Sequence, residues 1–367
     1  MKKFTGLLFG MLGVVMTGHA QTLRIANNNP APPTGVNVYT GTTALQDAIT
    51  ASAPGDIIYV VPSTASYGDI IIDTARTNLT IFGIGIRPQR DLSVLSKIGL
   101  VTIEASGVRI SGIGEMGTLR LASSNNPTPS NILIENNRLL DGIRAYSISG
   151  STIGNLIVRN NIFVSSIFFV LYDYTPNAII TNNVFIGGAG IIGGLTCTNV
   201  SLSYNIFANT GDADIFDRVE GCLFEHNIFY GVRVDITNVD NPSFGSGNTW
   251  NYNLAYGNSV ATYNVFEVAL KGNTGVGNLE STGPGNLDPL FVNFPFTTVW
   301  DQSYDFSLQA GSPAIGAGQS GQTIGPSGGD PAFDFDGNLL PFVQSITLPA
   351  VIPVGNDLPV NIKAKGN

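Results

Sequence analysis

The chain has 367 residues, of which 43% are hydrophobic and only 12% are charged, and it contains 44 glycines. In globular domains about a quarter of the residues are usually charged. The low charge here predicts an all-β solenoid or sandwich whose regular structure repeats itself. The formal net charge of −9 and the pI near 4.6 argue against a nucleic-acid partner, because phosphate binding requires a basic surface.

Residues 1–20 have the features of a cleaved signal peptide. Lys2 and Lys3 form a basic start, an apolar run follows over residues 7–16, and the segment ends in the small residues typical of a cleavage site. The apolar run is too short to cross a bilayer, and no later stretch predicts a transmembrane helix. We therefore expect an exported protein, secreted or at the cell surface, whose mature chain starts near Gln21.

Export places two cysteines in an oxidising environment. Cys197 and Cys222 could form a disulfide there. They fall at different phases of the repeat described below, which favours two buried thiols instead.

The segment "TALQDAITAS" predicts a short helix that covers the N-terminal end of the fold. Thr43 and Gln46 have the spacing of a capping box, and Leu45, Ala48 and Ile49 lie on one helical face. The runs "PGDIIYVVPS", "YGDIIID" and "NLTIFGIG" then predict the strands of the first coil.

Five segments repeat one pattern: "NILIENNRLLDG", "NLIVRNNIFVSS", "NAIITNNVFIGG", "NVSLSYNIFANT" and "GCLFEHNIFYGV". The second residue of each central pair is Asn137, Asn161, Asn183, Asn205 and Asn227, at steps of 24, 22, 22 and 22 residues. A fixed period with short strand-like runs predicts coils that stack on one another, not local hairpins. Equivalent asparagines would then form a hydrogen-bonded ladder at a sharp corner.

The same register predicts columns of side chains inside the stack. One column holds Phe163, Phe185, Phe207 and Phe229. Two more hold the pairs Leu156/Val158, Ala178/Ile180, Val200/Leu202 and Cys222/Phe224.

From Trp250 onward the spacing loosens. Asn253 follows Asn227 by 26 residues, and "YNVFEV" around Asn264 is out of register. Residues 270–330 are rich in glycine and aperiodic, so we expect them to close the C-terminal end of the stack. Two alternating runs near the C-terminus, "FVQSITL" and "LPVNIKAK", each lie close to a proline, which is typical of an edge hairpin.

These features predict an all-β fold, a right-handed parallel β-helix with a short N-terminal capping helix and a C-terminal β tail. The expected parts are a signal peptide over 1–20, an N-terminal extension over 21–42, the β-helix with its caps over 43–330, and the tail over 331–367.

The "NNIF" corners, the opening "ALQDAI…PGDIIYVVPS" and the ending "DPLFVN…DFSLQAGSPAIGAG" resemble bacterial secreted right-handed parallel β-helix proteins of the pectate-lyase-like superfamily. The ending is similar to the choice-of-anchor Q type, although Gly316 stands where an Asp is common. The resemblance spans residues 40 to 325 and implies an exported protein that handles polysaccharide, as a lyase, hydrolase, esterase or non-catalytic binder.

The superfamily usually binds substrate on the outer face of one sheet. Alignment on the asparagine ladder with strand alternation predicts that Ala145, Phe169, Ile191, Ala213 and Val234 point inward. It predicts an outward surface of Arg144, Tyr146, Phe168, Tyr172, Ile192, Asp212, Asp214, Arg233 and Asp235. Aromatic rings stack on sugars and carboxylates bind sugar hydroxyls or Ca²⁺, so we assign substrate binding to Arg144, Tyr146, Phe168 and Tyr172.

The stretch "TGDADIFDR" contains the densest acids of this surface. Asp212 and Asp214 share a strand face, and with Asp235 they could hold a Ca²⁺ ion. With Arg233 as base or charge clamp, Asp212 and Asp214 would be catalytic residues of β-elimination or hydrolysis. The alternative is an exposed strand that its acids keep soluble.

His226 is the only histidine of the mature chain, which argues against a Ser-His-Asp triad or a zinc site with several histidines. Lys97 and Arg109 belong to no recognisable motif. The interpretations that stay open are a Ca²⁺-assisted lyase or hydrolase acting on an acidic polysaccharide, a carbohydrate-binding surface protein, and a structural or adhesive rod. We expect a monomer in each case.

Overall fold

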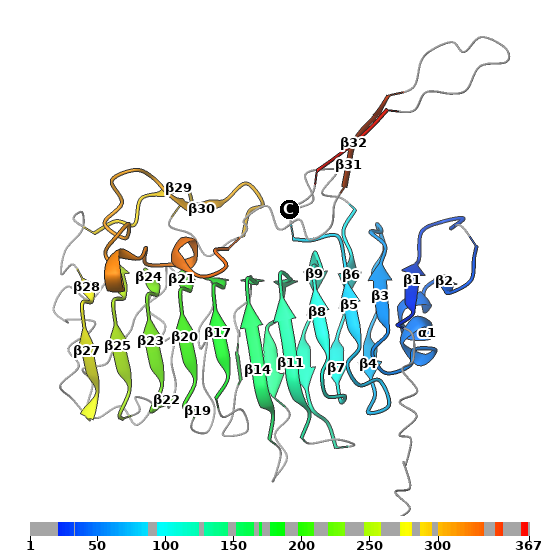
Figure 1. Cartoon of the computed structure of the whole chain (residues 1–367), viewed down its shortest axis with the longest axis horizontal. Helices are drawn as coiled ribbons and strands as arrows, with labels where there is room; N and C mark the ends of the chain where they lie inside the picture. Colours follow the sequence, from blue (N-terminus) through cyan, green and yellow to red (C-terminus); the bar gives the residue numbers. More distant parts are fainter. Residues whose placement is uncertain are drawn as a thin grey trace, which may run out of the picture.

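The computed structural model describes residues 21–32, 34–86, 94–124, 128–145, 152–164, 169–170, 177–187, 197–208, 219–231, 246–257, 272–280, 287–295, 300–333, 342–347 and 361–365. These residues form a parallel β-solenoid whose coils follow one another along a rod (Figure 1). The predicted fold class is therefore confirmed. The predicted signal peptide lies outside the described residues.

Three parallel sheets run along the rod. The twelve-stranded sheet has the order β2 (Val38–Thr40), β1 (Leu23–Asn27), β3 (Ile57–Val60), β5 (Thr80–Phe82), β8 (Arg109–Ser111), β11 (Ser130–Glu135), β14 (Gly154–Arg159), β17 (Ile179–Thr181), β20 (Ser201–Ser203), β23 (Leu223–Glu225), β25 (Thr249–Asn251) and β27 (Thr274–Val276). The nine-stranded sheet has the order β28 (Leu279–Glu280), β26 (Leu254–Tyr256), β24 (Ile228–Tyr230), β21 (Ile206–Ala208), β18 (Val184–Ile186), β15 (Ile162–Phe163), β12 (Arg138–Leu139), β9 (Glu115–Met116) and β6 (Lys97–Ile98).

The five-stranded sheet has the order β16 (Phe169–Val170), β13 (Ile143–Ala145), β10 (Leu119–Leu121), β7 (Val101–Ile103) and β4 (Ile70–Ile72). Two further strands, β19 (Cys197–Thr198) and β22 (Val219–Glu220), pair in parallel. From β5 to β16, each coil thus contributes one short strand to each of the three sheets in turn.

The asparagine ladder is present and is longer than predicted. Asn183 shows the pattern: its side-chain Nδ2 donates to Asn205 Oδ1 at 3.1 Å, and its Oδ1 accepts from the backbone N of Asn161 at 2.9 Å. The same bonds continue past the predicted end to Asn253 and Asn278. The additional residues of the last coils lie in the connections between strands, so the ladder asparagines stay aligned. The predicted loss of register after Trp250 is therefore wrong.

Left-handed backbone occurs at two positions in each coil that contains β11, β14, β17, β20 or β23 of the twelve-stranded sheet. The residue just before the ladder asparagine has a φ between 52° and 56° at Asn136, Asn160, Asn182, Tyr204, His226 and Tyr252. Five residues upstream of the first five of these, φ is also positive at Asn131, Asn155, Asn177, Asn199 and Gly221. Asn and Gly suit this conformation, which explains the Asn doublets: the first Asn turns the corner and the second forms the ladder.

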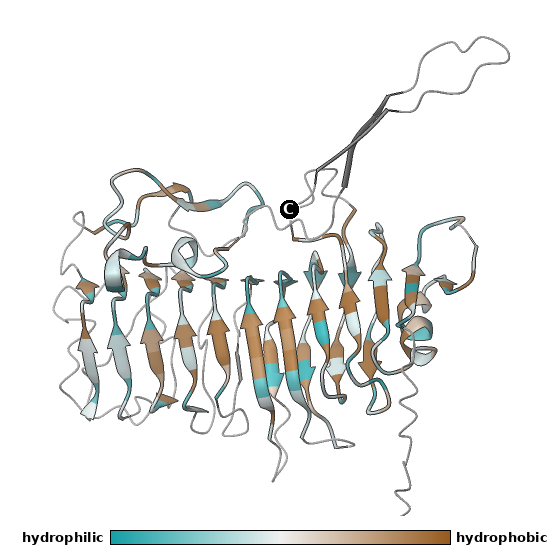
Figure 2. Cartoon of the chain, in the orientation of Figure 1, coloured by the Kyte–Doolittle hydropathy of each residue, from teal (hydrophilic) through white to brown (hydrophobic). Residues whose placement is uncertain are grey.

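The interior is filled by the predicted columns, and apolar residues recur from coil to coil along the rod (Figure 2). Phe163, Phe185, Phe207 and Phe229 stack with ring centroids 4.6, 4.9 and 5.2 Å apart. Cys222 is buried as a thiol whose Sγ lies 3.4 Å from the Glu220 carbonyl oxygen, so no Cys197–Cys222 disulfide forms.

Helix α1 (Ala44–Thr50) covers the N-terminal end of the rod and buries Leu45, Ala48 and Ile49, as predicted. The predicted capping box does not form, because Thr43 Oγ1 donates to the Asp47 carboxylate and makes no bond to the helix backbone. Gln46 instead pairs with the exposed edge of β4, accepting from the N–H of Ile71 at 2.8 Å and donating to its carbonyl at 3.2 Å.

The C-terminal closing segment, residues 287–333, begins later than predicted because β27 and β28 still belong to the stack. It contains the antiparallel pair β29 (Phe291–Asn293) and β30 (Asp305–Leu308) and the short 3-10 helices η2 (Gln319–Gly321) and η3 (Pro326–Gly328). Its Phe291, Phe294 and Phe306 pack on outward apolar residues of the nine-stranded sheet, which runs beneath it (Figure 1).

The last part of this segment, from Gln319 to Pro331, follows the corner column back along the rod. The N–H of Gln319 donates to His226 Nε2 at 3.0 Å, Tyr204 donates to the Gln322 side chain at 3.0 Å, and Asn182 donates to the Pro331 carbonyl. Between Gln319 and Pro331, residues with higher numbers therefore contact earlier coils of the solenoid.

Near the C-terminus, β31 (Phe342–Thr347) and β32 (Asn361–Lys365) pair as an antiparallel hairpin formed by the two alternating runs. No helix within the described ranges has the length and apolarity that crossing a membrane requires.

Candidate functional site

The outer face of the five-stranded sheet carries two arginines in register. Arg144 in β13 points outward with 43% of its side chain exposed, between the buried Ile143 and Ala145. It pairs directly with Arg120 of β10, the outward residue of the preceding coil. The predicted alternation of β13 is therefore correct.

Little negative charge lies close to these two arginines. Arg144 Nη2 lies 3.4 and 3.5 Å from the carboxylate oxygens of Asp141, whose Oδ2 also accepts the Thr118 hydroxyl at 2.5 Å. Asp141 is itself 45% exposed. Within the described part of the chain, Arg144 Nε has no hydrogen-bond partner and Arg120 has no ion pair.

Of the predicted site residues, only Arg144 is among the described ones. Tyr146, Phe168, Tyr172, Asp212, Asp214, Arg233 and Asp235 lie outside them. The predicted alignment of the next coil needs a correction, because Phe169 pairs with Ile143 and not with Ala145. The connection from β15 to β16 is two residues longer than its predecessor, which shifts the register without moving the asparagine ladder.

The described residues contain no group of three or more His, Cys, Asp or Glu side chains that could hold a metal ion. The proposed Ca²⁺ ligands lie outside this part of the chain, so the calcium site stays a prediction.

A second charged cluster lies on the outer face of the twelve-stranded sheet. Glu135 is almost fully buried between two arginines: Arg159 contacts its Oε2 through Nε at 2.8 Å and Nη2 at 2.7 Å, and Arg109 contacts its Oε1 through Nε at 2.7 Å and through Nη2. Both forks face the carboxylate, an arrangement that Arg favours. Arg109, which the sequence assigned to no motif, thus belongs to a satisfied ion-pair network, and we assign that network to stability.

A third charged row crosses the nine-stranded sheet at Lys97, Glu115 and Arg138. Glu115 Oε2 lies 3.8 Å from Lys97 Nζ and 3.5 Å from Arg138 Nη2. One carboxylate thus forms two ion pairs, both of them long. Beyond Arg138 the outward residues of this sheet are apolar from Ile162 onward, where the closing segment covers them.

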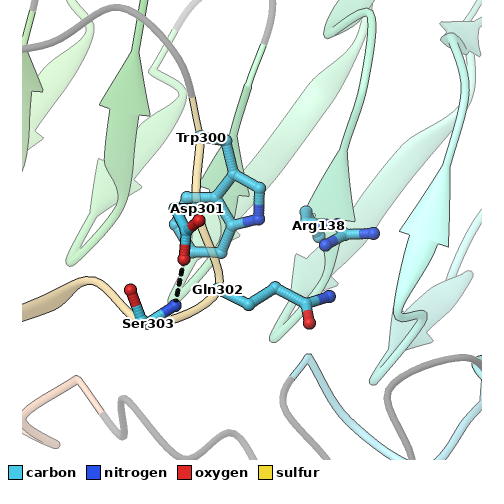
Figure 3. Close-up of a pocket in the computed structure, with 5 residues that line it drawn as sticks. All are labelled: Arg138, Trp300, Asp301, Gln302 and Ser303. Carbon is cyan, nitrogen blue, oxygen red and sulfur yellow. Dashed lines mark hydrogen bonds between the residues drawn. The ribbon is translucent and has the colours of Figure 1, made fainter.

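A pocket of about 580 Å³ opens where the charged row meets the closing segment. It is lined by Arg138 from β12 and by Trp300, Asp301, Gln302 and Ser303 (Figure 3). The loop of residues 300–303 is held by an Asx turn, in which Asp301 Oδ1 accepts the N–H of Ser303 at 2.7 Å. Sequence reasoning missed this pocket because its two walls are more than 160 residues apart in the chain.

Arg138 is an unusual residue for a surface pocket. Only 9% of its side chain is exposed, and its buried Nε has no hydrogen-bond partner among the described residues. Burial lowers the pKa of the Arg138 guanidinium from its ordinary value, and Glu115 opposes this shift.

No family model matches the chain, and no curated protein matches it. Among solved structures, the chain is similar to the PL6 family alginate lyase AlyGC, with a TM-score of 0.36 and 12% sequence identity. The match covers 64% of this chain and 38% of that chain.

Proposed function

We propose that this protein binds an acidic polysaccharide on the outer face of the five-stranded sheet, with Arg120 and Arg144 as carboxylate-binding residues. The observation that carries the proposal is the direct pairing of these two arginines on neighbouring strands. The pair stands out in a chain with a formal net charge of −9.

Arginine suits this role because its planar fork binds a carboxylate through two parallel hydrogen bonds. Neighbouring parallel strands lie about 4.8 Å apart, so the two guanidinium groups offer donors at successive points along the rod. A polymer with a carboxylate on each sugar can occupy both points at once, and the two contacts then reinforce each other.

The finer part of the proposal concerns turnover. As a lyase, the protein would remove a proton next to a carboxylate, with Arg233, Asp212 and Asp214 as catalytic residues and Ca²⁺ held by Asp212, Asp214 and Asp235. The sequence supports this part through the shared strand face of the acids. Tyr146, Phe168 and Tyr172 would supply stacking surface for the sugar rings. A non-catalytic binding protein at the cell surface is the alternative, and it requires only the arginine face.

The test uses the full chain and a panel of uronic-acid polymers with a neutral glucan as control. We expect retention on the acidic polymers that weakens as salt rises, because exposed charges are screened. The double variant R120Q/R144Q should lose at least about tenfold in affinity, since hydrogen bonds to charged groups contribute about 1.5–3 kcal/mol each.

The matched control is K363Q/K365Q, which removes the same two charges from β32, outside the solenoid. If the two double variants lose the same affinity, the effect comes from net charge alone, and the proposed site is overturned. Ultraviolet absorbance of unsaturated products in the same samples separates a lyase from a binding protein.

A further inference from the structure

We propose that the pocket between Arg138 and the loop of residues 300–303 is a second binding site, which takes a single carboxylated sugar unit. This site lies on the nine-stranded sheet, whereas the polysaccharide face lies on the five-stranded sheet, so the two proposals stand independently.

The first argument is the state of Arg138. A buried guanidinium needs a nearby anion and partners for its N–H groups, because an unpaired buried charge is costly. Glu115 meets this need only in part: it contacts one nitrogen at 3.5 Å and divides its charge with Lys97. Arg138 Nε is buried and has no partner in the described chain, so the pairing of the guanidinium is incomplete, and an anion held beside it in the pocket would balance its charge.

The second argument is the opposite wall. Trp300 offers an aromatic face, and Gln302 offers an amide with both donors and an acceptor. Aromatic faces with a few placed polar groups are the usual lining of small-molecule sites, and a volume near 580 Å³ is within their range of about 300–1,000 Å³. The Asx turn at Asp301 holds the backbone of the loop that carries these two side chains.

Asp301 narrows the class of ligand. Its exposed carboxylate disfavours a ligand with several negative groups. One carboxylate for Arg138 together with hydroxyls for the Gln302 amide describes a uronate unit, free or at the end of a chain.

Tryptophan fluorescence reads this pocket selectively. The chain has two tryptophans, and the other one, Trp250, is fully buried and stacked on Phe224 with centroids 3.8 Å apart. We expect a saturable change in emission when galacturonate is added to the full-length protein. Glucose and acetate should bind at least about tenfold more weakly, since each lacks one half of the recognised groups.

The variants are R138Q, which should weaken galacturonate binding at least about tenfold, and Q302A, which should weaken it about threefold without altering the sheet. R120Q/R144Q should leave the response unchanged, which separates a failure here from a failure of the polysaccharide site. No saturable response, an equal response to glucose, or an equal response to acetate would overturn the proposal. Unchanged galacturonate binding in Q302A and R138Q would do the same.

Discussion

The asparagine ladder can be tested at Asn183, in the middle of the stack. The variant Asn183→Val removes a side chain that is 0% exposed and that bonds in both directions along the rod. Its Oδ1 accepts from the backbone N of Asn161 at 2.9 Å, and its Nδ2 donates to Val158 O at 2.9 Å and to Asn205 Oδ1 at 3.1 Å.

The magnitude follows from what each partner retains. Asn161 Nδ2 keeps bonds to Ile134 O and Arg159 O, but the backbone N–H of Asn161 loses its acceptor in a buried place. One orphaned buried donor costs about 1–3 kcal/mol, and the lost bonds from Nδ2 add about 1 kcal/mol. We expect the free energy of unfolding to fall by about 2–4 kcal/mol.

Urea unfolding followed by tryptophan fluorescence measures this change as a shift of the midpoint. The control is Asn251→Val, the same substitution on the half-buried outer face of β25, where a β-branched residue is well tolerated. We expect that control to change stability by less than about 0.5 kcal/mol, as is usual at surface positions. If the two variants lose the same stability, the ladder contributes no more than an exposed asparagine and the reasoning fails.

Two further predictions concern protons and calcium. Burial lowers the pKa of His226, whose Nε2 must stay unprotonated to accept from Gln319. Stability should therefore be complete above the unfolded pKa near 6.5 and decline below it, by at most about 2 kcal/mol at pH 5. Thermal melts of wild type and His226→Asn at pH 7 and 5 check this, and an identical pH response in both would refute it. Calcium should raise the melting temperature of the wild type, and D212A/D214A should abolish this rise. If calcium leaves the melting temperature of the wild type unchanged, the metal hypothesis is wrong.

The repeat made much of the fold predictable. Stacked coils place equivalent residues one strand spacing apart, so a period in the sequence becomes a column in space. This is why Asn183 and Phe185 could be assigned to their ladder and core column without coordinates. The corner at His226 follows the same rule: it stacks between Tyr204 and Tyr252 with centroids 4.7 and 5.4 Å away.

The rest depended on contacts that no period encodes. The final coils were missed because longer connections change the spacing between ladder residues while the corners stay aligned, as Asn253 shows. The Arg138 pocket was missed because the closing segment folds back over the sheet and brings Trp300 beside an early coil. The Glu115–Arg138 contact itself joins residues on neighbouring strands and could have been predicted, had the earlier coils been aligned.

Charges one coil apart show how the outer faces differ. Glu135 and Arg159 are 24 residues apart on paired strands of the twelve-stranded sheet, and their opposite charges attract each other. Arg120 and Arg144 have the same spacing on the five-stranded sheet, yet they present like charges side by side. Directly opposed like charges destabilise a sheet, and Asp141 offsets this only at 3.4 Å with a half-exposed carboxylate. An anion bridging both arginines would replace this repulsion with attraction. The favourable free energy of binding an acidic polymer should therefore be largest on the five-stranded face and smallest on the face around Glu135.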